Sequence, residues 1–327
     1  MSLFAAPTAS ILLCSVLLLA LLRSTARFVP LDRPNERSLH QAPVPRAGGL
    51  ALVPAILAGW ALTPGAAWLP ICIALALCAI SYLDDLRGLP VGARLGSHLV
   101  GAALVVPAAL PGTSLAWAAL LVIGTVWIVN LYNFMDGSDG LAGGMTVIGF
   151  SAYGLGASFA GVGWLASVSF SIAAAAAAFL AVNFHPARIF LGDSGSIPLG
   201  YLAAALGLYG VSEGAWPLWF PLLVFAPFIG DATVTLAKRL ARRERVWRAH
   251  RDHYYQRLVR MGLGHRGTAY VAYAAMVVCA ACALWARDQS TLLQLATFGS
   301  ATILLVLAAA TVDVRWARLN RAGKGAA

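Results

Sequence analysis

Long runs of hydrophobic residues alternate with short polar segments along most of the chain. A helix needs about 20 predominantly apolar residues to cross a bilayer, and several of the runs reach or approach that length. Because helices satisfy their own backbone hydrogen bonds inside a bilayer, the pattern predicts an all-α, polytopic integral membrane protein. About eleven transmembrane helices are predicted, near residues 6–22, 48–63, 66–83, 98–111, 115–132, 141–159, 162–182, 197–212, 216–236, 268–286 and 291–311. The short fourth and eighth spans leave re-entrant segments open as an alternative.

Composition supports this class of protein. The 327 residues are 60% hydrophobic and 11% charged, whereas a soluble domain is roughly 25% charged. The polar segments are too short to form a separate core, so residues 1–327 are predicted to form a single integral membrane domain. The net charge of +10 comes from loops that flank the apolar runs, which argues against nucleic-acid binding. The five cysteines lie inside apolar runs, so they predict no disulfide framework.

The basic residues are strongly biased to one side of the predicted membrane domain. Of the 23 Lys and Arg residues, only Arg287 lies outside the loops of that side. By the positive-inside rule this side is cytoplasmic, which predicts an N-terminus outside the membrane and a C-terminus inside. The cytoplasmic loops are predicted at residues 23–47, 84–97, 133–140, 183–196, 237–267 and 312–327.

Acidic residues gather on the same side, although Asp and Glu contribute little to topology. They stand at the ends of four predicted spans, so they predict an active-site cleft that faces the cytoplasm. Each position also has a simpler structural explanation: a solvated helix end, a turn or a helix N-cap. The carboxylates concerned are Asp84 and Asp85, Asp136 and Asp139, Asp193, and Asp231.

Several carboxylates opposite a basic loop can hold a divalent cation and a polyphosphate together. Mg²⁺ prefers oxygen ligands and usually takes one or two carboxylates, and Arg or His can neutralise the remaining phosphate charge. The glycines of "DGSDGLAGG" predict close approach of a ligand to the backbone. Histidines and tyrosines in "HRDHYYQRL" suit a nucleotide diphosphate and its base or sugar. Together these segments favour phosphoryl transfer.

Five segments, in order and spacing, resemble the polyprenyl-phosphate N-acetylhexosamine-1-phosphate transferases of glycosyltransferase family 4. They are "PNERSLHQAPVPRAGGLA", "SYLDDLRG", "NLYNFMDGSDGLAGG", "NFHPARIFLGDSGS" and "HRDHYYQRL". The resemblance implies transfer of N-acetylhexosamine 1-phosphate from a UDP-sugar to undecaprenyl phosphate, with release of UMP. It also implies a requirement for Mg²⁺, or Mn²⁺ in its place, a location in the bacterial inner membrane, and a start to O-antigen or envelope polysaccharide synthesis.

The resemblance assigns roles by motif. It implies Asp193 and Asp136 as metal ligands, and an acidic catalytic group that also includes Asp84, Asp85 and Asp139. Substrate binding is implied for Arg37, His40, Arg46, Asn133, Asn183, His250, Arg251 and His253.

Two departures from the family pattern bear on the substrate. Gly88 stands where some relatives have a third carboxylate, and "HRDHYYQRL" has fewer histidines than the branch that makes the peptidoglycan precursor. A phospho-N-acetylmuramoyl-pentapeptide transferase remains the nearest alternative, and a membrane carrier or lipid-binding scaffold is the alternative of another class. The sequence is compatible with a homodimer but does not determine the oligomeric state.

Overall fold

The computed structural model describes residues 4–23, 29–32, 43–245 and 250–324, with side chains described to residue 321. Two short strands, β1 (Leu31–Asp32) and β2 (Val44–Pro45), pair antiparallel, with Leu31 opposite Pro45. All other regular structure in the described residues is helical, which confirms the predicted all-α class. The helices are α1 (Ala5–Arg23), α2 (Gly48–Ala61), α3 (Trp68–Arg87), α4 (Val91–Ala109), α5 (Leu115–Phe134), α6 (Leu141–Phe159), α7 (Gly163–Asn183), α8 (Asp193–Ser212), α9 (Trp219–Val224), α10 (Ala226–Ala241), α11 (Tyr254–Leu258), the π-helix η1 (Val259–Leu263), α12 (Gly264–Ala286) and α13 (Thr291–Lys324).

Eight helical segments among the described residues are long and apolar enough to cross a membrane. They include α4 and α8, with 19 and 20 residues, so the two spans predicted to be short form full-length helices. Three of the eleven predicted spans are not among the eight: α2 is shorter, α6 is less apolar, and the span at 216–236 is not one helix. That span is divided at Phe225 into α9 and α10, in a segment that contains Pro217, Pro221 and Pro227. Proline lacks a backbone N–H and so interrupts helical hydrogen bonding.

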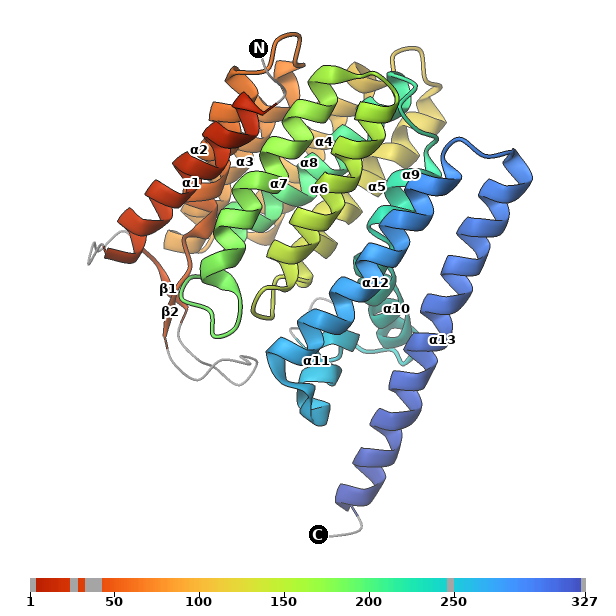
Figure 1. The fold of residues 1–327 in the computed structure, drawn as a ribbon. Helices are drawn as coiled ribbons and strands as arrows, with labels where there is room; N and C mark the ends of the chain where they lie inside the picture. The colour runs from red at the N-terminus through yellow and green to blue at the C-terminus, as the bar shows by residue number, and fades with distance from the viewer. Residues whose placement is uncertain (1–3, 24–28, 33–42, 246–249, 325–327) are drawn as a thin grey trace.

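The helices pack as a bundle with α8 near its centre (Figure 1). α8 packs against both α3 and α5, and 83% of its most apolar 18-residue stretch is buried. α1, α2, α6 and α7 form one side of the bundle, where α7 lies between α1 and α6. α12 and α13 lie on the other side, and only 6% of the most apolar 18-residue stretch of α13 is buried. The central position of α8 places its N-terminus among the ends of several other helices.

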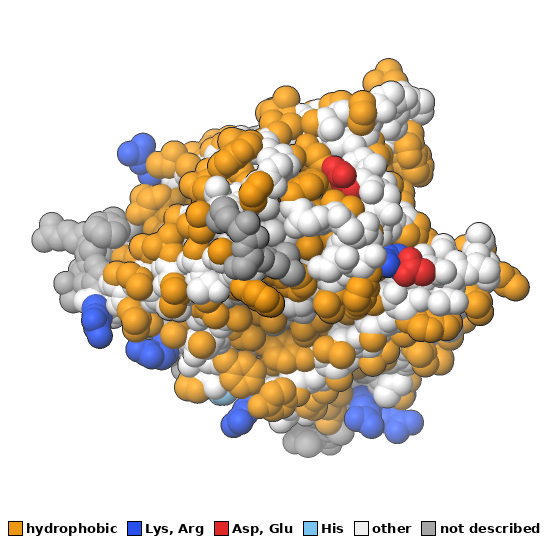
Figure 2. All heavy atoms as spheres, turned by 45° about the horizontal axis from the view of Figure 1, so that its top comes forward, with side chains coloured by type: hydrophobic (Ala, Val, Ile, Leu, Met, Phe, Trp, Pro, Cys, Tyr) orange, Lys and Arg blue, Asp and Glu red, His pale blue; other side chains and the backbone are white. Residues whose placement is uncertain are grey.

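The two ends of the bundle differ in charge. α1 begins at the top of Figure 1, and α13 ends at the bottom, beyond the loops that carry most of the basic residues. The top, turned forward in Figure 2, shows mostly hydrophobic and uncharged side chains with few charged groups. The charged end is therefore the end where β1, β2 and α11 lie.

Candidate active site

The segment before α8 is held against the start of α2 by backbone hydrogen bonds. Gly48 N–H donates to Phe190 O and Gly49 N–H donates to Leu191 O, both at 2.9 Å. At the next residue the chain turns into α8 through Gly192, whose φ of 73° is a left-handed conformation that favours glycine. The first turns of α2 and α8 lie so close together that a Cβ at Gly49 would be 2.3 Å from the Gly195 nitrogen. This contact fixes the position of Asp193 relative to the loop that precedes α2.

Arg46, at the end of that loop, pairs with two carboxylates from different helices. Its Nη2 forms a short ion pair with Asp193 Oδ1, at the start of α8, and lies 3.4 Å from Asp85 Oδ1, near the end of α3. The Asp85 side chain is only 3% exposed, and no hydrogen bond to its buried Oδ2 is found within the described part of the chain. Two acids therefore share one guanidinium, and one buried oxygen is left for another partner.

Asn133 and Asp136 complete this cluster from the end of α5. The Asn133 amide donates to Asp193 Oδ1 at 3.0 Å and to Ser196 Oγ at 2.9 Å. Asp136 lies in the loop that follows α5. Asp193 is thus used as a shared acceptor, and the N-cap position that was an alternative role for it belongs to Gly192. We call Arg46, Asp85, Asn133, Asp136 and Asp193 the acidic cluster.

The electrostatics of the acidic cluster favour a bound cation. Burial lowers the pKa of the Arg46 guanidinium, but the nearby acids outweigh this and the pKa lies above its usual value. Burial raises the pKa of the Asp136 carboxyl well above its usual range; Arg46 opposes the rise, and Asp193 and Asp85 add to it. A carboxyl that is hard to ionise in its present surroundings gains the most from a further positive charge. The acids that raise the pKa of Arg46 are Asp193, Asp85, Asp32 and Asp136.

The donor chemistry of the cluster fits Mg²⁺. Carboxylate oxygens are the hard ligands that this ion prefers, and Asp85 Oδ2 is a buried oxygen in need of a partner. Asp136 and Asp193 would hold the ion on the side of α5 and α8, with Asp85 from α3. Asn133 orients Asp193 through its amide, as groups next to metal ligands commonly do.

Asp84 has a different environment from its neighbour Asp85. Its Oδ1 accepts from the Leu89 backbone N–H at 2.6 Å, and its Oδ2 lies 3.2 Å from Arg94 Nη1 at the start of α4. Both carboxylate oxygens are thereby used to join the end of α3 to α4. The structure brings only the second member of the predicted acidic pair to Arg46 and Asp193.

Asp139 and Asn183 lie in a second group, between the 135–140 loop and the end of α7. Asp139 Oδ2 lies 2.6 Å from His185 Nδ1 and accepts from Ala187 N–H at 3.1 Å, and Oδ1 lies 3.7 Å from His265 Nδ1. The Asn183 amide accepts from Gly140 N–H and donates to Ile189 O. Asn183 thus joins the loop before α6 to the loop before α8, while Asp139 contacts two histidines.

The "HRDHYYQRL" segment is tied to the membrane helices through Asp231 of α10. Asp231 accepts from the backbone N–H groups of Tyr254 and Tyr255, both at 2.9 Å, at the start of α11. Its Oδ1 also lies 3.1 Å from His253 Nδ1, and the rings of His253 and His250 are 4.9 Å apart. The Tyr255 hydroxyl donates to Phe134 O at the end of α5, which places this segment beside the loop that carries Asp136.

Three further residues were predicted to bind substrate: Arg37, His40 and Arg251. Arg37 and His40 lie outside the described residues. Arg251 lies between His250 and Asp252, and its carbonyl accepts from Arg260 at 3.4 Å.

The glycines of the "DGSDGLAGG" segment serve packing between helices. A Cβ at Gly137 would lie 2.1 Å from the Tyr255 hydroxyl, and one at Gly144 would lie 2.0 Å from Tyr273 Cε1. The expectation that these glycines admit a ligand to the backbone stays a prediction. They admit aromatic side chains that anchor α11 and α12.

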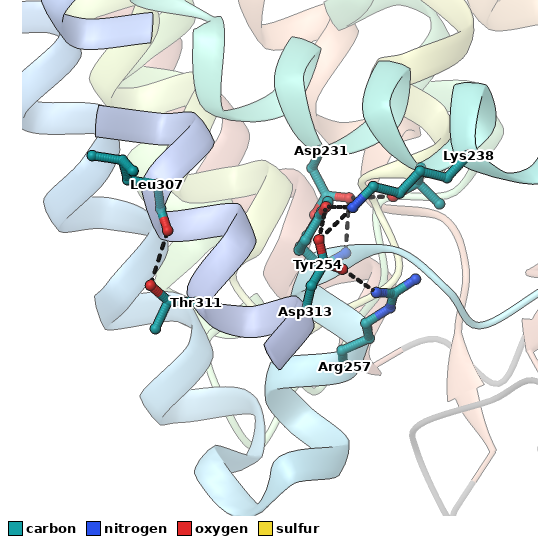
Figure 3. A network of polar contacts seen from close by, with 8 residues as sticks. Asp231, Lys238, Tyr254, Arg257, Leu307, Thr311 and Asp313 are labelled. Carbon is teal, nitrogen blue, oxygen red and sulfur yellow. Dashed lines mark hydrogen bonds and ion pairs between the residues drawn. The ribbon is translucent and has the colours of Figure 1, made fainter. Parts of the chain in front are cut away.

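A separate polar network, which we call the Asp313 network, fastens the last helix to α10 and α11 (Figure 3). Asp313 of α13 pairs with Lys238, accepts from the Tyr254 hydroxyl at 3.1 Å and accepts from Arg257 at 2.8 Å. Lys238 also donates to the Tyr254 hydroxyl at 2.6 Å. Tyr254 is thus held by Asp231 through its backbone N–H and by Asp313 through its hydroxyl.

An apolar groove lies beside α5, between Trp117 and Ile128. It has a volume of about 430 Å³ and is lined by Trp117, Leu121 and Ile128 of α5, together with Leu208 of α8 and Phe225 at the break between α9 and α10. The lining ends at Ile128 on α5 and at Ala203 on α8, and it includes no residue of the acidic cluster.

Three polar residues of these groups were not singled out from the sequence: Asp32, His185 and His265. His185 falls inside a recognised motif, so that motif was a signal for it. Asp32 and His265 stand outside the recognised motifs, and only the packing of β1 and α12 brings them to these groups.

Fold and site define an all-α polytopic membrane protein with several carboxylates and an arginine gathered where its helices end. The family model described as "Glycosyl transferase family 4" matches residues 67–211. This match spans α3 to α8 and so includes Asp85, Asn133, Asp136 and Asp193.

Similarity to known proteins extends beyond that match. The chain is 30% identical to a Bacillus subtilis protein named "Probable undecaprenyl-phosphate N-acetylglucosaminyl 1-phosphate transferase", over 74% of this chain and 73% of that one. It is 28% identical to the decaprenyl-phosphate N-acetylglucosaminephosphotransferase of Mycolicibacterium smegmatis, over 76% and 73%. A phospho-N-acetylmuramoyl-pentapeptide-transferase of Synechococcus is 34% identical over 53% of this chain and 56% of its own. The chain belongs to glycosyl transferase family 4.

Proposed function

We propose that the protein transfers N-acetylhexosamine 1-phosphate from a UDP-sugar to undecaprenyl phosphate and releases UMP, the first step of a lipid-linked O-antigen or envelope polysaccharide. The coarser assignment, a polyprenyl-phosphate sugar phosphotransferase, is supported by the family and by the names of two relatives. The observation that carries the proposal is the sharing of Arg46 by Asp85 and Asp193 beside Asn133 and Asp136.

The membrane placement follows from charge and from the groove. The acidic cluster lies at the end of the bundle that holds most of the basic residues, which supports a cytoplasmic site, an outside N-terminus and a cytoplasmic C-terminus. In a bacterium this corresponds to the inner membrane. The groove of about 430 Å³ beside α5 suits the polyprenyl chain of the acceptor, because its lining is apolar.

The reaction we propose is a single displacement. An oxygen of the lipid phosphate attacks the sugar-proximal phosphorus of the UDP-sugar, the bond to the UMP oxygen breaks, and UMP leaves. A phosphate monoester has its second pKa near 6, so the attacking group is largely ionised at neutral pH and needs no strong base. Mg²⁺, when bound, would offset negative charge on the transferring phosphoryl group.

The residues of the chain have distinct tasks in this scheme. Asp193, Asp136 and Asp85 would hold Mg²⁺, with Mn²⁺ as the alternative ion. Arg46 is half-exposed and can turn part of its guanidinium to a phosphate oxygen. His250 and Arg251 lie on the loop beside the cluster and would bind the diphosphate or sugar. Asn133 holds Asp193 in place, so it is a positioning residue.

The experiment is a nucleotide-release assay with detergent-purified protein, undecaprenyl phosphate, Mg²⁺ and a panel of UDP-N-acetylhexosamines. UMP that appears only with lipid and metal supports the proposal and identifies the sugar. Release of UDP would contradict it, because that product belongs to ordinary glycosyl transfer. UDP-N-acetylmuramoyl-pentapeptide is included in the panel because of the Synechococcus relative. Preference for that donor would support peptidoglycan-precursor synthesis instead.

A further inference from the structure

Asp139, His185 and His265 form a group that is separate from the acidic cluster. One potential ligand atom from each of the three lies within 4.8 Å of those of the others. They come from three segments: the loop before α6, the loop after α7, and the start of α12. We propose that these residues bind a divalent cation of the zinc type, at a site distinct from that of Mg²⁺.

The ligand types favour such an ion. Two imidazole nitrogens with one carboxylate oxygen suit Zn²⁺, Co²⁺ or Ni²⁺, whereas Mg²⁺ prefers oxygen ligands alone. Three protein ligands with a fourth position left to water are also common for zinc. A zinc-type ion can therefore be distinguished from Mg²⁺ by its ligands as well as by its position.

The distances between ligand atoms are close to those that an ion would impose. Tetrahedral ligands at about 2.1 Å from zinc lie about 3.4 Å from one another. Asp139 Oδ2 is 2.6 Å from His185 Nδ1, and Asp139 Oδ1 is 3.7 Å from His265 Nδ1. The first distance is shorter than the tetrahedral value and the second is longer, and they involve different oxygens of Asp139, so the side chains must adjust to admit the ion. The two imidazole rings are stacked, with centroids 5.2 Å apart and planes 5° apart. Because a ring nitrogen binds a metal in the plane of its ring, one ring must rotate for both nitrogens to reach the same ion.

The surroundings supply both support and access. The Ala187 backbone N–H donates to Asp139 Oδ2 at 3.1 Å and fixes the carboxylate that the two histidines share. The Ser138 hydroxyl lies 3.0 Å from His265 Nδ1, close enough to turn toward a bound ion. The Asp139 side chain is 9% exposed and that of His265 is 12% exposed, but 42% of the His185 side chain is exposed. An ion can therefore enter from the His185 side.

The test measures metal binding in the purified protein without lipid or UDP-sugar. Metal is removed with a chelator, and Zn²⁺ is titrated against a chromophoric chelator in excess Mg²⁺. We expect wild type to bind about one Zn²⁺ per chain at micromolar concentration or lower, with the excess Mg²⁺ failing to displace it. Absence of Zn²⁺ binding in this range would overturn the proposal.

Asparagine variants separate metal binding from hydrogen bonding. In His185→Asn and His265→Asn the amide replaces the Nδ1 atom, so contacts to Asp139 can persist while a nitrogen ligand is lost. Each is expected to weaken Zn²⁺ binding by about tenfold or more. His250→Asn is the matched control, because His250 and His253 form the other close histidine pair among the described residues. The proposal would be overturned if His250→Asn weakened Zn²⁺ binding equally, or if His185→Asn and His265→Asn did not weaken it.

A measurement on wild type guards against variants that fail to fold. Histidines are modified with diethyl pyrocarbonate with and without Zn²⁺, and the modified positions are mapped by mass spectrometry. Protection of His185 and His265 is expected, and unchanged modification of both would contradict the site. These measurements need no transfer reaction. A negative result for Zn²⁺ binding would therefore not contradict the proposed function, and a negative result in the nucleotide-release assay would not contradict the metal site.

Discussion

The acidic cluster and the Asp313 network both join charged side chains from several helices, but their charge balance is opposite. In the acidic cluster Asp85 and Asp193 share Arg46, and Asp136 and Asp32 add further negative charge. In the Asp313 network one carboxylate accepts from Lys238, Arg257 and Tyr254 (Figure 3). The second set has two cations for one carboxylate, whereas the first has an excess of acid.

From this difference we predict that the acidic cluster, and not the Asp313 network, is a ligand site. Asp313 accepts from two cations and a hydroxyl, and these contacts stabilise the packing of α10, α11 and α13. A cluster with excess negative charge and an unpartnered oxygen is stabilised when a cation binds, at the cost of stability without it. The two regions should therefore respond differently to substitution: the acidic cluster in activity, and the Asp313 network in stability.

The largest expected effect comes from Asp193→Asn. The change removes a charged metal ligand but keeps an acceptor for Asn133, so Mg²⁺-dependent UMP release should fall by at least about a hundredfold. The elution profile in detergent should be unchanged. Asp288→Asn is the control, because Asp288 is a carboxylate at the opposite end of the bundle. Near-normal turnover of folded Asp193→Asn would show that this carboxylate does not hold the metal.

Gly49→Ala should have the next largest effect, on stability. Its Cβ would approach backbone atoms of Ser194 and Gly195 within 2.4 Å, so α2 and α8 must separate, with a loss of about 1–3 kcal/mol. Thermal unfolding in detergent measures the change. In the control, Gly92→Ala, a Cβ meets nothing within 4 Å among the described residues, and stability should hold or rise. An unchanged midpoint for Gly49→Ala would mean that the close approach of α2 and α8 is not required.

Asp313→Asn should have a smaller effect, because its carboxylate is 32% exposed. Loss of one charge from the partly exposed network should cost about 1 kcal/mol of stability. The KM for UDP-sugar should rise severalfold with less change in kcat, since the contacts that hold α11 to α13 are weakened. Thr311→Val is the control, because the Thr311 hydroxyl donates only to Leu307 O of the same helix among the bonds drawn in Figure 3. A fall in kcat with unchanged KM would place Asp313 in the reaction and break the comparison.

The smallest expected effect concerns pH and His250. Burial lowers the pKa of His250 from 6.5 to about 4, with His253 and Arg239 contributing. The unfolded chain therefore takes up a proton near pH 6.5 that the folded protein resists down to about pH 4. Stability should be constant above pH 6.5 in this respect and should fall as the pH drops from 6.5 toward 4.

Removal of the imidazole tests this dependence. His250→Asn should show a shallower acid loss of thermal stability than wild type between pH 6.5 and 4. Parallel curves for the two proteins would indicate that His250 does not resist protonation in the folded state.

Much of the architecture could be predicted from the sequence, because hydrophobicity and charge belong to individual residues. The apolar runs predicted the positions of α1 to α3, α5 to α8 and α12 to within several residues. The predicted loops at 84–97 and 312–327 were wrong in part, because α4 already begins at Val91 and α13 continues to Lys324. The error at residues 216–236 arose because hydropathy was given more weight than the prolines of that segment, which divide it into α9 and α10. The five motifs were sufficient to recognise the family, because their order and spacing can be read from the sequence without knowing how far apart the residues lie in space.

What the sequence by itself determined is therefore an all-α membrane protein with its acids and bases at one end and the motifs of a known family. Only the tertiary structure decided which acids meet. Asp84 and Asp85 are adjacent, yet one joins α3 to α4 and the other faces Arg46. Asp136 and Asp139 are three residues apart, yet Asp139 pairs with histidines from two other segments. The physical reason is that side-chain direction and the partner across a helix contact depend on packing between segments far apart in the chain, such as that of Gly49 against Gly195.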